Sequence, residues 1–141
     1  MIENAKSGIQ LNSIILMESI FYRGSIELEP DMKNFKMDIK VDSQEKGSFV
    51  KSNVTVKIGD IKNRKADEFA IQISMVGVFE RLGSTPLTSE EFKNINAPAI
   101  VYPYIRQLVR TITLDASMNP VLLPVMNFQK LYISKQENKP T

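Results

Sequence analysis

The chain has 141 residues, with 18 Lys and Arg against 16 Asp and Glu, and it contains no Cys, His or Trp. This length predicts one domain over residues 1–141, with flexible ends at about 1–8 and 135–141. The absent residue types exclude disulfides, thiolate or imidazole metal sites and Ser–His catalysis. We therefore expect no metal, no cofactor and no enzymatic activity.

The charges do not form a nucleic-acid-binding tract. The most basic stretch, residues 62–65, is flanked by Asp60, Asp67 and Glu68, so we interpret it as a solvated turn and expect no nucleic-acid partner. The N-terminal sequence lacks the features of a signal peptide, and the longest apolar run, residues 14–17, is too short to span a bilayer. These features predict a cytoplasmic protein that does not insert into a membrane.

The first 82 residues have the period-two pattern of β-strands. Residues 35–42 alternate apolar and charged side chains, and residues 50–58 and 69–79 alternate in the same way. A strand solvated on one face indicates an antiparallel sheet. Residues 9–22 alternate more weakly and carry apolar residues on both faces, so we expect a partner subunit to cover one of them. Short connections predict a four-stranded meander.

A helical pattern follows Gly83. Thr88 and Glu91 have the spacing of a capping box, which predicts a short helix that starts there. A second, longer helix follows residues 96–98, and Pro103 predicts either a kink in its first turn or a regular helix that begins close to Pro103.

The longer helix has a wide apolar face. Its stripe consists of residues at 4-3-4 spacing, Val101, Ile105, Leu108 and Ile112. Arg106, Gln107, Arg110 and Thr113 are expected on the polar side. A face this wide can contact the sheet and another subunit at once, so the stripe, together with Ile14 and Leu16 of the first strand, is our candidate oligomer interface.

The segment 118–126 is apolar, yet Pro120 and Pro124 prevent a regular helix or a central strand there. We expect this loop to cover an apolar surface. Asn127 then predicts the cap of a last short helix. The fold class is therefore α+β, with a four-stranded antiparallel β-meander, a long helix, a Pro-rich crossover loop and a short C-terminal helix.

Two stretches carry a family resemblance. Residues 96–106, Asn-Ala-Pro-Ala-Ile-Val-Tyr-Pro-Tyr-Ile-Arg, resemble the helix-start signature of the SecB export chaperones. Residues 116–128, Ala-Ser-Met-Asn-Pro-Val-Leu-Leu-Pro-Val-Met-Asn-Phe, are similar to that family's crossover loop, which ends in Asn-Phe. The four upstream strands agree with the family in order and spacing. The chain thus looks like a divergent SecB-like protein.

The resemblance implies an ATP-independent holdase that binds unfolded polypeptides in an apolar groove and assembles as a homotetramer, a dimer of dimers. By position, the groove candidates come from the second strand, the crossover loop and the last helix: Phe35, Met37, Met118, Val121, Leu122, Leu123, Val125, Met126, Phe128, Leu131 and Tyr132. Methionine suits such a surface because its flexible, polarisable side chain adapts to many partners.

The resemblance also implies a delivery partner, the SecA translocation motor. Of the family's two acidic positions on the first strand, Glu18 matches one and Tyr22 occupies the other. Glu18 is therefore the candidate for docking to the motor. SecB-like proteins also serve as dedicated chaperones of an antitoxin, and this chain could serve one such partner only.

The same residues also fit structural roles or a different ligand. Each apolar residue of the loop could simply line the core of its own subunit. Arg106 fits a structural or interface contact, and Tyr102 and Tyr104 fit packed aromatics with a hydroxyl that reaches water or backbone. The same apolar cleft could instead hold a hydrophobic small molecule.

Overall fold

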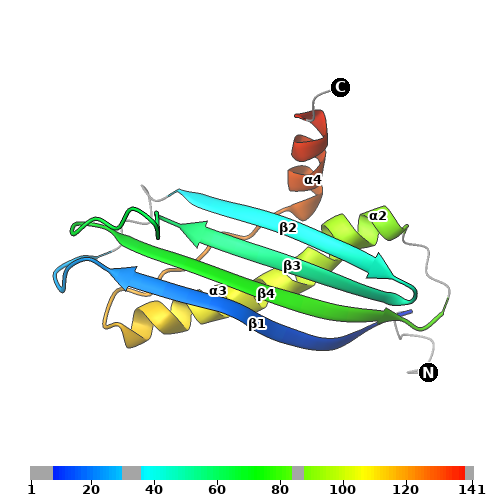
Figure 1. The fold of residues 1–141 in the computed structure, drawn as a ribbon, viewed down its shortest axis with the longest axis horizontal. Helices are drawn as coiled ribbons and strands as arrows, with labels where there is room; N and C mark the ends of the chain where they lie inside the picture. The colour runs from blue at the N-terminus through cyan, green and yellow to red at the C-terminus, as the bar shows by residue number, and fades with distance from the viewer. Residues whose placement is uncertain (1–7, 30–35, 84–87, 139–141) are drawn as a thin grey trace.

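A computed structural model of the chain describes residues 8–29, 36–83 and 88–138. A long four-stranded antiparallel sheet is covered on one face by helices (Figure 1). The elements in chain order are β1 (Ile9–Arg23), β2 (Met37–Lys46), β3 (Phe49–Ile58), β4 (Phe69–Arg81), α2 (Ser89–Glu91), η1 (Phe92–Asn96), α3 (Ala97–Asp115) and α4 (Phe128–Glu137). The predicted α+β class is confirmed.

The strand order corrects one part of the prediction. The sheet runs β1-β4-β3-β2, so only β2, β3 and β4 form a meander, and β1 pairs with β4 from Ile9–Arg81 to Arg23–Phe69. Neighbours in sequence are neighbours in a sheet only about two-thirds of the time. Here the two longest strands, of 15 and 13 residues, pair with each other.

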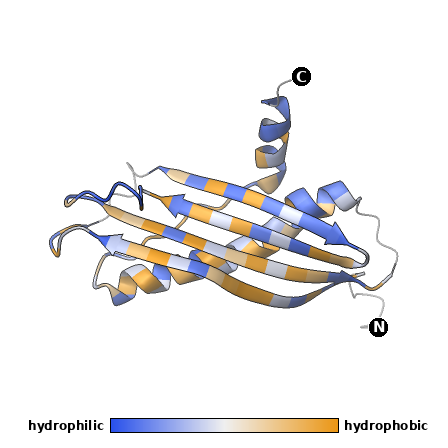
Figure 2. Cartoon of the chain, in the orientation of Figure 1, coloured by the Kyte–Doolittle hydropathy of each residue, from blue (hydrophilic) through white to orange (hydrophobic). Residues whose placement is uncertain are grey.

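The core lies between the helices and one face of the sheet. Val54, Val56, Ile71 and Ile73 are completely buried there, while the charged row of β2, including Lys40 and Asp42, is exposed on the other face as the alternation predicts. Figure 2 shows hydrophobic and hydrophilic residues alternating along β2. At Gly77, an added Cβ would lie 2.6 Å from Cγ2 of Val101. Glycine therefore permits the close approach of α3 to β4.

The helical region is continuous from Ser89 to Asp115 and contains a π-helical turn. The Thr88 hydroxyl accepts a hydrogen bond from the Glu91 amide at 3.1 Å, which confirms Thr88 as the N-cap. In the π-helical turn, the Ala97 amide donates to the carbonyl oxygen of Phe92. Because α3 begins at Ala97, Pro103 lies inside the helix and the alternative start near Pro103 is wrong. Within the described residues, no helix is both long and apolar enough to cross a membrane.

Candidate functional site

The crossover segment (residues 116–127) joins α3 to α4 on the helix-covered side of the sheet (Figure 1). Side chains of α3 bind its backbone. Thr113 Oγ1 accepts from the Val121 amide at 2.9 Å, and Arg106 Nε donates to the Leu123 carbonyl at 3.1 Å. Thr113 is fully buried, so its predicted place on the polar side of the helix is wrong. Its hydroxyl also donates to backbone carbonyls of α3, which satisfies it inside the core.

Tyr102 makes the third bond from α3 to this segment. Its hydroxyl donates to the Pro124 carbonyl at 2.6 Å, and only 3% of the residue is exposed. Burial raises the pKa of Tyr102 to about 12, with the nearby positive charge of Arg106 acting weakly in the opposite direction. The neutral hydroxyl is the form that can donate this bond, so burial favours the state that holds the segment.

The apolar side chains of the crossover segment alternate between core and surface. Met118, Val121 and Leu123 are buried, whereas Leu122 is 58% exposed and Val125 is 83% exposed. Hydrogen bonds to the backbone keep the segment in place without using the two exposed side chains. The segment therefore presents apolar surface outward while its inner side closes the core.

The last helix begins where the sequence predicts. Asn127 Oδ1 accepts from the Lys130 amide at 3.0 Å, which caps α4. Phe128 is buried, and its ring packs edge-on against Tyr102 with centroids 5.5 Å apart. α4 then extends past the β2 edge of the sheet (Figure 1). Helix α4 is thus anchored at its start, and its later turns lie beside the edge strand.

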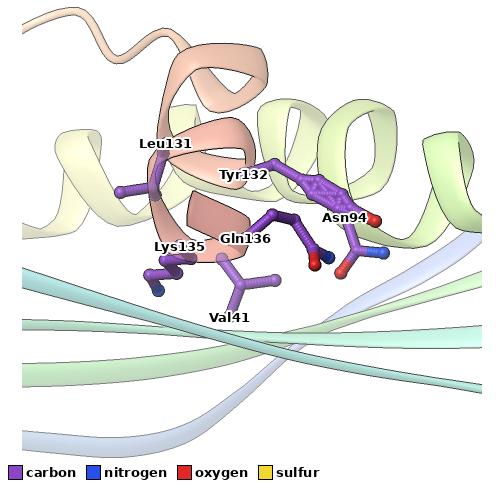
Figure 3. Close-up of a pocket in the computed structure, with 6 residues that line it drawn as sticks. All are labelled: Val41, Asn94, Leu131, Tyr132, Lys135 and Gln136. Carbon is purple, nitrogen blue, oxygen red and sulfur yellow. The ribbon is translucent and has the colours of Figure 1, made fainter. Parts of the chain in front are cut away.

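A small pocket opens between α4, η1 and β2. It has a volume of about 140 Å³ and is lined by Val41, Asn94, Leu131, Tyr132, Lys135 and Gln136. Figure 3 shows Tyr132 and Gln136 reaching from α4 toward Asn94, with Val41 on the strand below. Lys135 Nζ also donates to the Ile39 carbonyl at 3.3 Å, so this carbonyl of the edge strand points away from the sheet. An apolar floor with a polar rim can accept one side chain of an extended polypeptide.

The predicted groove residues differ in how far they are exposed to solvent. Phe35 lies outside the described residues. Four of the others are buried in their own subunit, as the core-lining interpretation has it: Met118, Val121, Leu123 and Phe128. Four more are partly buried: Met37, Met126, Leu131 and Tyr132. Only Leu122 and Val125 are largely exposed. The surface that a polypeptide could touch in this conformation therefore combines these two residues with the pocket beside α4.

Most of the predicted interface residues are buried or partly buried in their own subunit. Val101 and Ile105 are fully buried against the sheet, and Ile14, Leu108 and Ile112 pack against the same core. Leu16 is 49% exposed. Several apolar residues that are exposed were not among the predicted interface residues: Ile15 and Met17 on β1, and Ile100 and Tyr104 on α3. Bulges between Leu11 and Ser13 and between Leu16 and Glu18 change which β1 residues share a face, and no sequence pattern revealed them.

Glu18 lies on the sheet face opposite the helices. It accepts a hydrogen bond from Gln72 Nε2 across the β1–β4 pair. The same face carries Lys40 on β2 and Lys57 on β3, both exposed, and Asp38 opposite Lys57. Among the residues that the structure describes, the charge of this face is therefore mixed, without a continuous acidic patch around Glu18.

Sequence reasoning missed the polar pocket residues Asn94, Lys135 and Gln136. Asn94 lies on the π-helical turn, where its side-chain nitrogen Nδ2 donates to the Glu90 backbone carbonyl at 2.9 Å. A π-helical turn shifts the residues that share a helix face, and the sequence gives no signal for it. Lys135 and Gln136 could have been found from their spacing after Leu131 and Tyr132, which places all four on one side of α4.

Fold and site together define a class of protein with a four-stranded sheet and two helices on one face. The apolar crossover segment joins these helices and is hydrogen-bonded to the first of them. The family model described as "Preprotein translocase subunit SecB" matches residues 17–139, and the chain belongs to the SecB family.

The relatives are distant. An uncharacterised protein of Methanocaldococcus jannaschii is 27% identical over 106 residues, covering 75% of this chain and 68% of its own length. A protein-export protein SecB of Azoarcus is 24% identical over 144 residues, covering 99% of this chain and 95% of its own. Among solved structures, a SecB-like chaperone of Mycobacterium tuberculosis, in complex with a peptide from the HigA1 antitoxin, has a TM-score of 0.62 at 16% identity. That match covers 84% of this chain and 88% of the other, and it supports the fold.

Proposed function

We propose that this protein is an ATP-independent holdase that binds non-native polypeptides on the outer side of the crossover segment and in the pocket beside α4. The observation that carries the proposal is the exposure of Leu122 and Val125 on a segment whose backbone is already hydrogen-bonded to α3. Covering such a side chain contributes roughly 1.5–3 kcal/mol. Several weak contacts of this kind suit a chaperone that holds and releases many sequences.

The edge of β2 offers a second type of contact. The Ile39 carbonyl points outward, beside the pocket, where Lys135 Nζ binds it. An extended chain that replaces this bond can pair with the edge through its backbone. Backbone pairing does not depend on sequence, whereas the pocket takes one side chain. A client in extended conformation could therefore combine both. The pocket volume of about 140 Å³ is below the range typical of small-molecule sites, which makes the carrier alternative less suited to this surface.

Assembly and delivery belong to the same proposal. We expect a homotetramer, because Ile15, Leu16 and Met17 on β1 and Ile100 and Tyr104 on α3 leave two apolar surfaces open. Glu18 remains the candidate for docking to SecA, although its mixed surroundings favour a weak contact. The proposal places the protein in the cytoplasm, where chains await export. Light scattering during size-exclusion chromatography tests the assembly.

A dedicated chaperone of one antitoxin is the second candidate. The observation in its favour is the fold similarity to the M. tuberculosis chaperone that was solved with an antitoxin peptide. A dedicated chaperone would protect one cognate chain and leave generic unfolded proteins unprotected.

The test uses a chemically denatured enzyme, citrate synthase, diluted into buffer without nucleotide. We expect the wild-type protein to suppress aggregation, measured by light scattering, and the double variant Leu122→Ser, Val125→Ser to suppress it less. Leu82→Ser is the matched control, because Leu82 is also 58% exposed but follows β4, outside the candidate site. Equal protection by the double variant and the wild type would contradict the proposed surface. No protection by the wild type would favour the dedicated or carrier alternative.

A further inference from the structure

The C-terminal end of α3 carries no cation of its own. Its last turn contains no basic residue and ends at Asp115, although the negative end of a helix dipole favours a positive charge. The helix stops in a tight turn, in which the Ser117 amide donates to Leu114 and the Met118 amide donates to Thr113. Ser117 has a φ of 58°, a left-handed conformation. This turn satisfies the Leu114 and Thr113 carbonyls but brings no positive charge, so the helix end favours a cationic partner from elsewhere in the chain.

Arg23, at the last position of β1, supplies that partner. Its Nη1 donates to the Ala116 carbonyl at 2.5 Å. The remaining nitrogens bind the chain after β1: Nε donates to Ser25 O at 2.9 Å, and Nη2 donates to Ile26 O at 2.7 Å and Leu28 O at 3.0 Å. A guanidinium is suited to this role because its planar fork directs several donors at once. One side chain thus binds the end of α3 and the connection after β1 together.

Glu29 extends the same arrangement by a few residues. Its Oε2 accepts a hydrogen bond from the Asn119 amide at 2.9 Å. Arg23 and Glu29, which we call the β1 clamp, therefore hold residues 116–119. The side chains of Tyr102, Arg106 and Thr113 hold residues 121–124. Backbone carbonyls of α3 already bind the amides of residues 116–118, and the clamp adds side-chain bonds to Ala116 and Asn119, in the stretch that precedes Leu122.

We propose that Arg23 is a positioning residue for polypeptide binding: through Ala116 it fixes the start of the crossover segment and, together with the bonds from Thr113 and Arg106, keeps Leu122 in its outward position. This inference rests on the proposed function. Arg23 bonds carbonyl groups of two connections and no side chain of the hydrophobic core. Removing its donors is therefore expected to loosen the crossover segment while the sheet and its contact with α3 persist.

The test compares Arg23→Met, which keeps an unbranched apolar stem, with Arg64→Met. Arg64 is a matched control because it also lies at this end of the sheet, with its guanidinium 5.3 Å from the Tyr22 ring and Nε bonded to Ile61 O. Hydrogen–deuterium exchange reports the mobility of each segment. Fluorescence anisotropy reports the affinity for a labelled, reduced and carboxymethylated α-lactalbumin, which stays unfolded.

For Arg23→Met we expect about tenfold faster amide exchange in residues 118–123, unchanged exchange in β3 and β4, and about five- to tenfold weaker binding of the probe. Arg64→Met should change neither the amide exchange of residues 118–123 nor the affinity for the probe. Exchange that rises equally in the strands, or loosening without a change in affinity, would overturn the proposal, because Arg23 would then be only structural. If the wild type fails to bind the probe, the proposed function fails while the exchange result still judges the clamp.

A second variant covers the case in which Arg23→Met does not fold. Glu29→Ala removes the acceptor of the Asn119 amide and leaves β1 intact. We expect the same pattern with a smaller amplitude, about two- to fivefold in both measurements, because one hydrogen bond is lost instead of several. Unchanged exchange at residues 118–123 in this variant would contradict the clamp.

Discussion

The Tyr102 hydroxyl donates a 2.6 Å hydrogen bond to the carbonyl oxygen of Pro124, while the Tyr102 ring packs edge-on against Phe128 at the start of α4. One side chain of α3 therefore holds both the end of the crossover segment and the beginning of the last helix. Because these two elements carry the proposed binding surface, the position of Tyr102 affects most of it.

This relationship predicts a dependence of stability on alkaline pH. The pKa of Tyr102 is about 12 in the folded protein, whereas a tyrosine in an unfolded chain ionises near pH 10. The folded state holds the proton more tightly, so the contribution is complete below about pH 10 and is lost as the pH rises toward about 12. In a titration of tyrosinate absorbance, the protein should show an ionisation step near the Tyr102 pKa of about 12. Tyr102→Phe should remove this step, and a titration that the substitution leaves unchanged would contradict the prediction.

Truncating two adjacent leucines should change the free energy of unfolding by very different amounts. Leu123 is 2% exposed and Leu122 is 58% exposed. Leu123→Ala should lower the free energy of unfolding by about 2–5 kcal/mol, because it leaves a cavity in the core. Leu122→Ala should change it by no more than about 0.5 kcal/mol, as surface substitutions usually do. Urea denaturation followed by circular dichroism measures both. Similar losses for the two variants would mean that Leu122 also packs inside.

Thr113 should tolerate serine better than valine. Thr113→Val keeps the shape but removes the acceptor of the Val121 amide, leaving a buried donor without a partner at a cost of about 1–3 kcal/mol. Thr113→Ser keeps the hydroxyl and loses one methyl group, so the crossover segment should stay in place. Faster amide exchange at Val121 in the valine variant alone would support this interpretation, and equal exchange in both variants would refute it.

Ser117→Gly should stabilise the protein. Ser117 has a φ of 58°, a conformation that costs a residue with a side chain about 1–2 kcal/mol. Glycine removes this strain but loses more conformational entropy on folding, so a net gain of about 0.5–1 kcal/mol is expected. Ser117→Ala is the control, since alanine keeps the strain and should give no gain. Thermal unfolding by calorimetry distinguishes the two.

The local patterns of the sequence predicted the elements well, because alternation and helical spacing act over neighbouring residues. The strands, the N-caps at Thr88 and Asn127 and the irregular apolar crossover all follow from such patterns. These local patterns do not determine the order of the strands in the sheet. The pairing of β1 with β4 depends on contacts between residues far apart in the chain, and nothing in the period of a strand specifies its neighbour.

The candidate site was predictable only in part for a related reason. Residues 118–126 are all apolar or proline except Asn119. Such a stretch does not reveal which side chains turn inward, and that choice depends on bonds from distant residues. Thr113 and Arg106 set the inward positions of Val121 and Leu123 through the backbone. Arg23 acts from 93 positions away in the chain. Such contacts appear only once the helix and the strand are folded together.

The two prolines of the crossover segment have a consequence for the protein's own solubility. A run of Val and Leu with a free backbone is the kind of sequence that stacks into steric zippers between molecules. Pro120 and Pro124 lack an amide hydrogen, so the Leu122 stretch between them cannot form a continuous ladder with the same stretch of another copy. The two prolines thus disfavour cross-β stacking of the segment whose apolar side chains are exposed to water.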